Sequence, residues 1–179
     1  MRHVPFALAA TAILVLGVGP ASALNVNRHI EAPGLPPAVW EFAGGFCTIK
    51  DWHPLVADCQ ETKEGDATFR TLTLKDGAKI KEKLLESDDA SYSYEIVESP
   101  LPVKNYKAKF SVADGNHENR TMVEWSADFE ANGASDEDAT KRIKDIFDGG
   151  LKGIKHKMLD ISGGESSGGG PGGENYHLA

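Results

Sequence analysis

Apolar and polar residues alternate through most of the chain between Pro54 and Ala131. A period of two is typical of strands that bury one face and expose the other to water. Five segments show this pattern. The residues at the alternate positions that would face the core are Arg70, Leu72 and Leu74; Ile80, Glu82 and Leu84; Tyr92, Tyr94 and Ile96; Tyr106, Ala108, Phe110 and Val112; and Val123, Trp125, Ala127, Phe129 and Ala131. Short turn sequences such as Asp76-Gly77 separate the segments, so we predict an antiparallel meander.

Shorter elements precede this meander. Spaced apolar residues predict a first strand over 24–32, which must end before Pro33. A short helix follows over 38–43, opened by two prolines that a first helical turn tolerates and stopped by two glycines. A second short helix over 48–52 has to end before Pro54, because proline disfavours helical backbone at the preceding residue.

Helical spacing returns after the meander. Ser135 and Asp138 resemble a capping box, and lysines near the other end suit the negative end of the helix dipole. One apolar stripe contains Ala139, Ile143, Ile146, Phe147, Gly150, Ile154 and Met158. The glycine pair 149–150 either bends the helix or lets it lie close to the sheet. We therefore predict one long helix that ends near Asp160.

This order of elements resembles a known superfamily. The segments that carry the resemblance are 39–42 (VWEF), 52–56 (WHPLV), 74–77 (LKDG), 82–85 (EKLL), 92–94 (YSY) and 123–127 (VEWSA). They are similar to the START/birch-pollen-allergen (SRPBCC) superfamily, in its polyketide cyclase/dehydrase and lipid-transport branch. The resemblance implies an α+β helix-grip fold, in which a curved antiparallel sheet wraps around a long C-terminal helix and two short helices follow the first strand.

Within that branch, the chain is most similar to the MxaD group, small exported proteins of bacterial methanol-oxidation gene clusters. This resemblance implies an accessory role in which the protein assists interaction and electron transfer between methanol dehydrogenase and its cytochrome c. No C-x-x-C-H haem-attachment sequence occurs, so we expect such a protein to bind its partners without a cofactor of its own. The alternatives are a carrier for an apolar or amphipathic small molecule, and a cyclase or dehydratase that uses His53 or Glu82.

The two ends of the chain differ from its middle. Residues 1–23 combine a short basic start, an apolar run and an Ala-Ser-Ala site, which is typical of a cleaved signal peptide and predicts export to the periplasm. Residues 161–179 are rich in glycine and too polar to bury a core, so we predict a disordered tail. The folded domain is then 24–160, with no membrane span in the mature protein.

Charge and cysteine content narrow the function further. The net charge of −8 argues against nucleic-acid binding, because the chain has no basic excess to displace phosphate counterions.

Cys47 and Cys59 are the only cysteines, and an oxidising compartment permits a disulfide between them. A short loop of this kind would stabilise the protein by about 3 kcal/mol at most. The alternative is two separate, buried thiols.

The sequence contains no recognised catalytic motif, so we expect the protein not to be an enzyme. No two histidines have the i, i+4 spacing of metal ligands, and no nucleophile motif or phosphate-binding glycine loop occurs. His53 is the best acid–base candidate, but a structural role is the more common one for such a residue. Four aromatic residues at core-facing strand positions should face a cavity under the long helix, unless the core is simply packed: Tyr92, Tyr94, Trp125 and Phe129.

Arg70 and Glu82 are charged residues at strand positions that would otherwise be apolar and face the core. A hairpin centred on Gly77 would pair Leu74 with Ile80 and make Arg70 and Glu82 diagonal neighbours. Isolated buried charges are costly, so we predict an inward-facing ion pair that lines the cavity. The alternative is a bulge that shifts the register and lets both side chains reach solvent.

Overall fold

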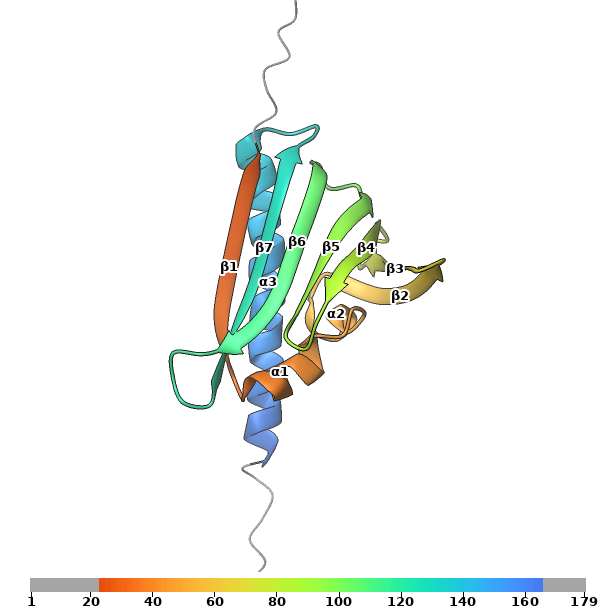
Figure 1. The fold of residues 1–179 in the computed structure, drawn as a ribbon. Helices are drawn as coiled ribbons and strands as arrows, with labels where there is room; N and C mark the ends of the chain where they lie inside the picture. The colour runs from red at the N-terminus through yellow and green to blue at the C-terminus, as the bar shows by residue number, and fades with distance from the viewer. Residues whose placement is uncertain (1–22, 166–179) are drawn as a thin grey trace, which may run out of the picture.

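The computed structural model describes residues 23–165 and consists of one sheet, one long helix and two short helices (Figure 1). All seven strands are antiparallel, in the order β1-β7-β6-β5-β4-β3-β2. The elements are β1 (Leu24–Pro33), α1 (Pro36–Ala43), α2 (Ile49–Trp52), β2 (Val56–Glu64), β3 (Ala67–Leu74), β4 (Lys79–Ser87), β5 (Ser91–Glu98), β6 (Val103–Asp114), β7 (Arg120–Ala131) and α3 (Asp136–Glu165). The predicted α+β helix-grip fold is confirmed.

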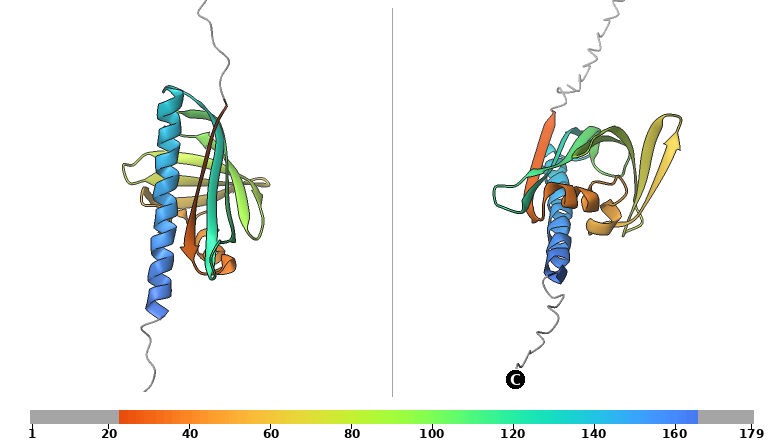
Figure 2. Two further views of the ribbon diagram at one scale, coloured as in Figure 1. Left: turned by 90° about the vertical axis from the view of Figure 1, so that its left-hand side faces the viewer. Right: turned by 60° about the horizontal axis from the view of Figure 1, so that its bottom comes forward.

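The sheet curves around α3 (Figures 1 and 2). The helix packs mainly on β1 and β7, while β2, β3 and β4 turn away from it. Helix α1 contacts β6 and β7, and α2 contacts β2 and α3. Register shifts interrupt the pairs β2–β3, β4–β5 and β6–β7. Such bulges increase local bend and twist, which accounts for the strong curvature.

Gly150 and Gly153 permit a close approach between α3 and α2. A Cβ on Gly150 would lie 2.7 Å from Cδ2 of His53 and 2.8 Å from Cζ3 of Trp125. A Cβ on Gly153 would collide with the carbonyl oxygen of Trp52. The helix continues unbroken through these positions, so the glycines bring it close to its neighbours and do not bend it.

The two ends of α3 can be compared with the helix boundaries predicted from the sequence. At the start, the Asp138 N–H donates to Oγ of Ser135 at 3.1 Å, which is the N-cap bond of a capping box, and the Ser135 hydroxyl donates to the Asp138 carboxylate at 2.8 Å. The helix continues to Glu165, past the expected end near Asp160, because each added residue of an existing helix gains a backbone hydrogen bond. The remaining predicted tail and nearly all of the predicted signal peptide lie outside the described residues.

The hairpin between β3 and β4 has a different register from the predicted one. Arg70 lies directly opposite Glu82, and Leu72 lies opposite Ile80. The turn is shorter than expected: the Gly77 N–H donates to the Leu74 carbonyl at 2.9 Å, and Gly77 takes a left-handed φ of 87°. The register shifts by an even number of residues, so both charged side chains stay on the inner face.

No helix in the described part of the chain is long and apolar enough to cross a lipid bilayer.

Candidate functional site

A cavity of about 50 Å³ lies between the inner face of the sheet, the segment after α2, and α3. By volume, it has room for roughly four water molecules. Most of its wall is apolar, and its polar lining residues are His53, Glu82, Tyr94, Tyr106 and Arg142. The other lining residues are Ile49, Leu55, Val56, Leu72, Leu74, Ile80, Ile96, Leu101, Trp125, Ile143, Ile146 and Phe147.

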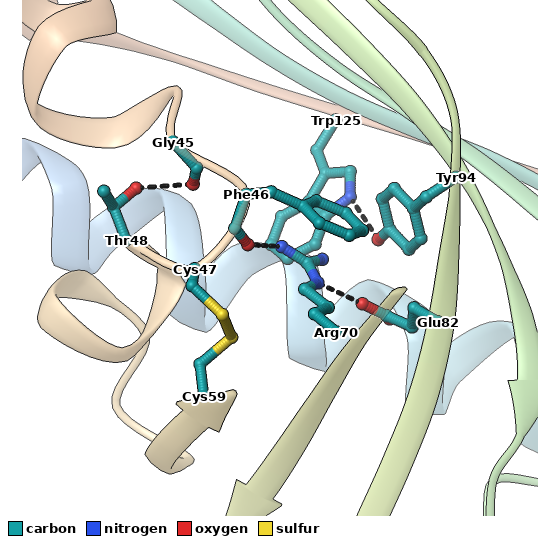
Figure 3. A network of polar contacts seen from close by, with 9 residues as sticks. All are labelled: Gly45, Phe46, Cys47, Thr48, Cys59, Arg70, Glu82, Tyr94 and Trp125. Atoms are coloured by element: carbon teal, nitrogen blue, oxygen red, sulfur yellow. Dashed lines mark hydrogen bonds and ion pairs between the residues drawn. A yellow bond between two sulfur atoms is a disulfide. The ribbon is translucent and has the colours of Figure 1, made fainter. Parts of the chain in front are cut away.

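The Arg70–Glu82 ion pair lies beside this cavity, and only Glu82 lines it (Figure 3). Arg70 Nε donates to Glu82 Oε2 at 2.5 Å, and both residues are buried, with exposed fractions of 0% and 4%. Arg70 Nη1 donates to the carbonyl oxygen of Phe46, which lies between the two short helices. The guanidinium also faces aromatic rings, with Cζ 4.2 Å from the ring centre of Phe46 and 4.9 Å from that of Tyr94.

Burial and mutual attraction compete in this pair. Burial alone would lower the pKa of Arg70, but the Glu82 charge and hydrogen bond outweigh it and hold that pKa above its usual value. Burial raises the pKa of Glu82, and the adjacent guanidinium counteracts this rise. Because arginine keeps its proton, an ionised Glu82 is the partner that leaves no uncompensated buried charge.

The guanidinium is not fully satisfied by the protein. Arg70 Nη2 and the Tyr92 hydroxyl are both buried, and neither makes a hydrogen bond of normal geometry within residues 23–165. A buried polar group without a partner costs free energy. Both groups lie next to each other, with Arg70 Cζ 5.7 Å from the ring centre of Tyr92, and neither residue lines the cavity.

His53 has both ring nitrogens engaged. Nε2 lies 3.1 Å from the carbonyl oxygen of Ile146 on α3, and Nδ1 accepts from the backbone N–H of Leu55 at 3.2 Å. This pattern requires the neutral tautomer with its proton on Nε2. Burial and, to a lesser extent, the Arg70 charge lower the pKa of His53, and the Ile146 carbonyl offsets only part of this, so that the pKa is about 4. The ring therefore joins α2 to α3 in its uncharged form.

A disulfide between Cys47 and Cys59 holds the segment that covers Arg70 (Figure 3). The two Cα atoms are 5.5 Å apart, and the bond connects the turn before α2 to strand β2. The Thr48 hydroxyl hydrogen-bonds in the same turn, 2.9 Å from the Ala43 carbonyl and 2.8 Å from that of Gly45. The crosslink thus restrains Phe46, whose carbonyl and ring both contact the guanidinium.

The cavity gathers some of the predicted site residues and not others. His53, Glu82, Tyr94 and Trp125 line it, and the Trp125 Nε1–H donates to the Tyr94 hydroxyl at 3.0 Å. Arg70 pairs with Glu82 as predicted but does not line the cavity, because Phe46 and the aromatic rings enclose its guanidinium.

Tyr92 and Phe129 face inward but do not reach the cavity wall. Tyr92 packs against Trp40, Phe46 and Phe110 beneath the short helices. Phe129 packs against Tyr106 near the open end of β7. Parity along a strand decides which face a side chain takes, but the curvature of the sheet decides which part of that face is filled.

The sequence analysis missed Phe46 and Arg142 as site residues. Phe46 belongs to no periodic segment, and its only signal is its position beside Cys47. Arg142 is exposed on α3 and lines the cavity together with the partly exposed Leu55 and Leu101. Its position depends on the packing of α3 against the sheet.

The fold and this cavity define a helix-grip protein, and comparisons with known proteins place it in a family. The family model described as polyketide cyclase/dehydrase and lipid transport matches residues 23–158. The chain belongs to this family, which confirms the superfamily resemblance found in the sequence. No curated protein sequence matches it.

Solved structures show the same arrangement. The protein XoxI from Bacillus cereus is 34% identical, with a TM-score of 0.73 over 77% of this chain and 97% of its own. An uncharacterised Bacillus thuringiensis protein is also 34% identical, with a TM-score of 0.72 over 76% of this chain and 100% of its own. The Zhui aromatase/cyclase from Streptomyces sp. R1128 shares the fold at 14% identity, with a TM-score of 0.64 over 79% and 96% of the two chains.

Proposed function

We propose that this protein binds a small, mainly apolar molecule between its sheet and α3. The observation that carries the proposal is an apolar cavity with a buried carboxyl group, that of Glu82, in its wall. Protein interiors normally pack to high density, and charged groups are rarely placed beside unfilled space in a core. Concave apolar sites with a few polar groups are the usual form of small-molecule sites.

The same site supports binding without catalysis. His53 would have to break a hydrogen bond to α3 or to Leu55 before it could transfer a proton, and its pKa of about 4 makes it a weak base. Glu82 is already bound to Arg70. We therefore propose a binding protein and not a cyclase or dehydratase.

The ligand can be sought in protein that has folded in the cell. The mature protein would be purified natively from periplasm, extracted with solvent, and analysed by mass spectrometry. Ile146→Trp fills the cavity from α3, and Leu159→Trp places the same side chain at an exposed position of the same helix. A compound that copurifies with the wild type and Leu159→Trp but not with Ile146→Trp supports the proposal. Equal contents in all three proteins reject it. A ligand weak enough to dissociate during purification is tested by xenon binding to the purified wild type, and a wild-type cavity that takes up no xenon also rejects the proposal.

A second candidate function is an accessory role in methanol oxidation, in the periplasm. It is favoured by the resemblance to the MxaD group, by the N-terminal segment typical of export, and by the acidic surface implied by the net charge. In this role the protein would assist electron transfer from methanol dehydrogenase to its cytochrome c by contact with one or both.

This role has a direct kinetic test. The mature protein would be titrated into purified methanol dehydrogenase and its cytochrome c while cytochrome reduction is followed. A saturable change in rate supports the accessory role. An unchanged rate, together with no complex in sedimentation, rejects it. Fractionation of cells that express the full chain tests the periplasmic location separately.

A further inference from the structure

We infer that the ligand of the cavity is a small neutral molecule that donates one hydrogen bond, through a hydroxyl or an amide N–H, to Glu82. This inference rests on the proposed binding function and specifies the chemistry of that site. It follows from three features of the described residues: a free acceptor on Glu82, the charge balance around it, and the size of the cavity.

The free acceptor is Glu82 Oε1. Arg70 Nε donates to Oε2, whereas no group in residues 23–165 donates a hydrogen bond to Oε1. A carboxylate accepts about four hydrogen bonds, so a single one leaves most of its capacity unused. The Glu82 side chain retains 6% exposure and lines the cavity, so a molecule inside would contact this carboxylate.

Most other buried polar groups at the cavity are already engaged, and Arg142, which also lines it, is exposed to water on α3 and so attracts an anion only weakly. His53 uses both ring nitrogens, and Trp125 Nε1 donates to Tyr94. Arg70 does not line the cavity, because Phe46 and the neighbouring aromatic rings enclose its guanidinium. Among the buried groups, the carboxylate is therefore the anchoring group of the cavity, and it requires a donor.

The charge balance favours a neutral donor. Glu82 already neutralises Arg70 within a buried pair, so an added ammonium group would be a second cation with no anion of its own. An added carboxylate would lose its hydration beside an existing carboxylate. A hydroxyl or amide N–H avoids both costs and supplies the hydrogen bond that Oε1 lacks.

The volume limits the size of the ligand. An apolar protein cavity of about 150 Å³ accepts benzene. The cavity here, at about 50 Å³, suits an apolar group of a few carbon atoms with one polar atom. Its affinity would be in roughly the millimolar range, because so few atoms make contacts.

Four probes of similar size separate these requirements. They are 2-propanol, which donates; acetone, which only accepts; isopropylammonium, a cation; and acetate, an anion. Each would be titrated into the ¹⁵N-labelled mature protein, with the amide signals of Glu82, Tyr94 and Phe147 as reporters. Xenon provides a fifth, purely apolar probe of the cavity itself. Ile146→Trp is the blocked control, and Leu159→Trp is the matched variant with an open cavity.

The inference predicts saturable binding of 2-propanol that is at least tenfold tighter than that of acetone, isopropylammonium or acetate. Leu159→Trp should retain this binding, and Ile146→Trp should lose it. If xenon binds but acetone or either ion binds as well as 2-propanol, the ligand class is wrong while the proposed binding function stands. If neither xenon nor any other probe reaches the cavity, the proposed function fails and the inference fails with it.

Discussion

The buried Arg70–Glu82 ion pair is best tested by removing one partner and then both. Glu82→Ala leaves the Arg70 guanidinium at 0% exposure with no counter-charge. Removing one member of a fully buried pair costs about 3–5 kcal/mol. With a urea m-value of about 2 kcal/mol per molar, the midpoint of unfolding should fall by about 2 M.

The double variant Arg70→Met with Glu82→Leu removes both charges and retains apolar volume. Replacing a whole buried pair by apolar residues is often neutral or stabilising. The remaining loss comes from the Phe46 carbonyl, which no longer receives a hydrogen bond, at about 1–3 kcal/mol. The double variant should therefore be more stable than Glu82→Ala alone, although it carries one more substitution.

The assay is equilibrium unfolding in urea without reductant, followed by tryptophan fluorescence and by circular dichroism. Lys81→Ala on the same strand is the matched control, because it breaks the solvent-exposed pair with Glu64 at 2.9 Å and should change stability far less. A loss under about 1 kcal/mol for Glu82→Ala would refute the buried pair. A double variant less stable than the single one would refute the argument from uncompensated charge.

Three further predictions concern stability. Replacing Cys47 and Cys59 by serine and alanine should lower the free energy of unfolding by about 3 kcal/mol; an unchanged urea midpoint under oxidising conditions would contradict this. Between pH 6.5 and about 4, the unfolded chain binds a proton on His53 while the folded protein does not. The free energy of unfolding should therefore decrease by roughly 3 kcal/mol in total as the pH is lowered through this range. His53→Gln should lack that component, and identical pH profiles for the two proteins would count against it. Gly150→Ala should destabilise the protein, because its Cβ would meet ring atoms at 2.7–2.9 Å, whereas Gly149→Ala, with its nearest atom at 3.7 Å, should stabilise α3 by up to about 1 kcal/mol. Thermal melts that rank these two variants in the reverse order would refute the close packing of α3.

The sequence by itself determined most of the elements and their inner faces, but it did not delimit β2 (Val56–Glu64). Alternation identified the five strands from β3 to β7, and the capping box at Ser135 located the start of α3. It also placed Arg70 and Glu82 on the inner face and indicated that they would pair. These features are local: side-chain periodicity and helix capping depend on neighbours within a few residues, so they are readable without knowledge of the fold.

Tertiary structure alone decided which inner-face residues meet in space. The turn geometry at Gly77 selected direct pairing of Arg70 and Glu82 over the diagonal arrangement. The curvature of the sheet then placed Tyr94 at the cavity and Tyr92 in a packed aromatic cluster, although the two have the same parity on one strand. Phe46 reached the guanidinium from a segment without periodicity. Such contacts depend on how elements far apart in sequence bend and pack against one another. Residue alternation along one strand carries no information about that packing.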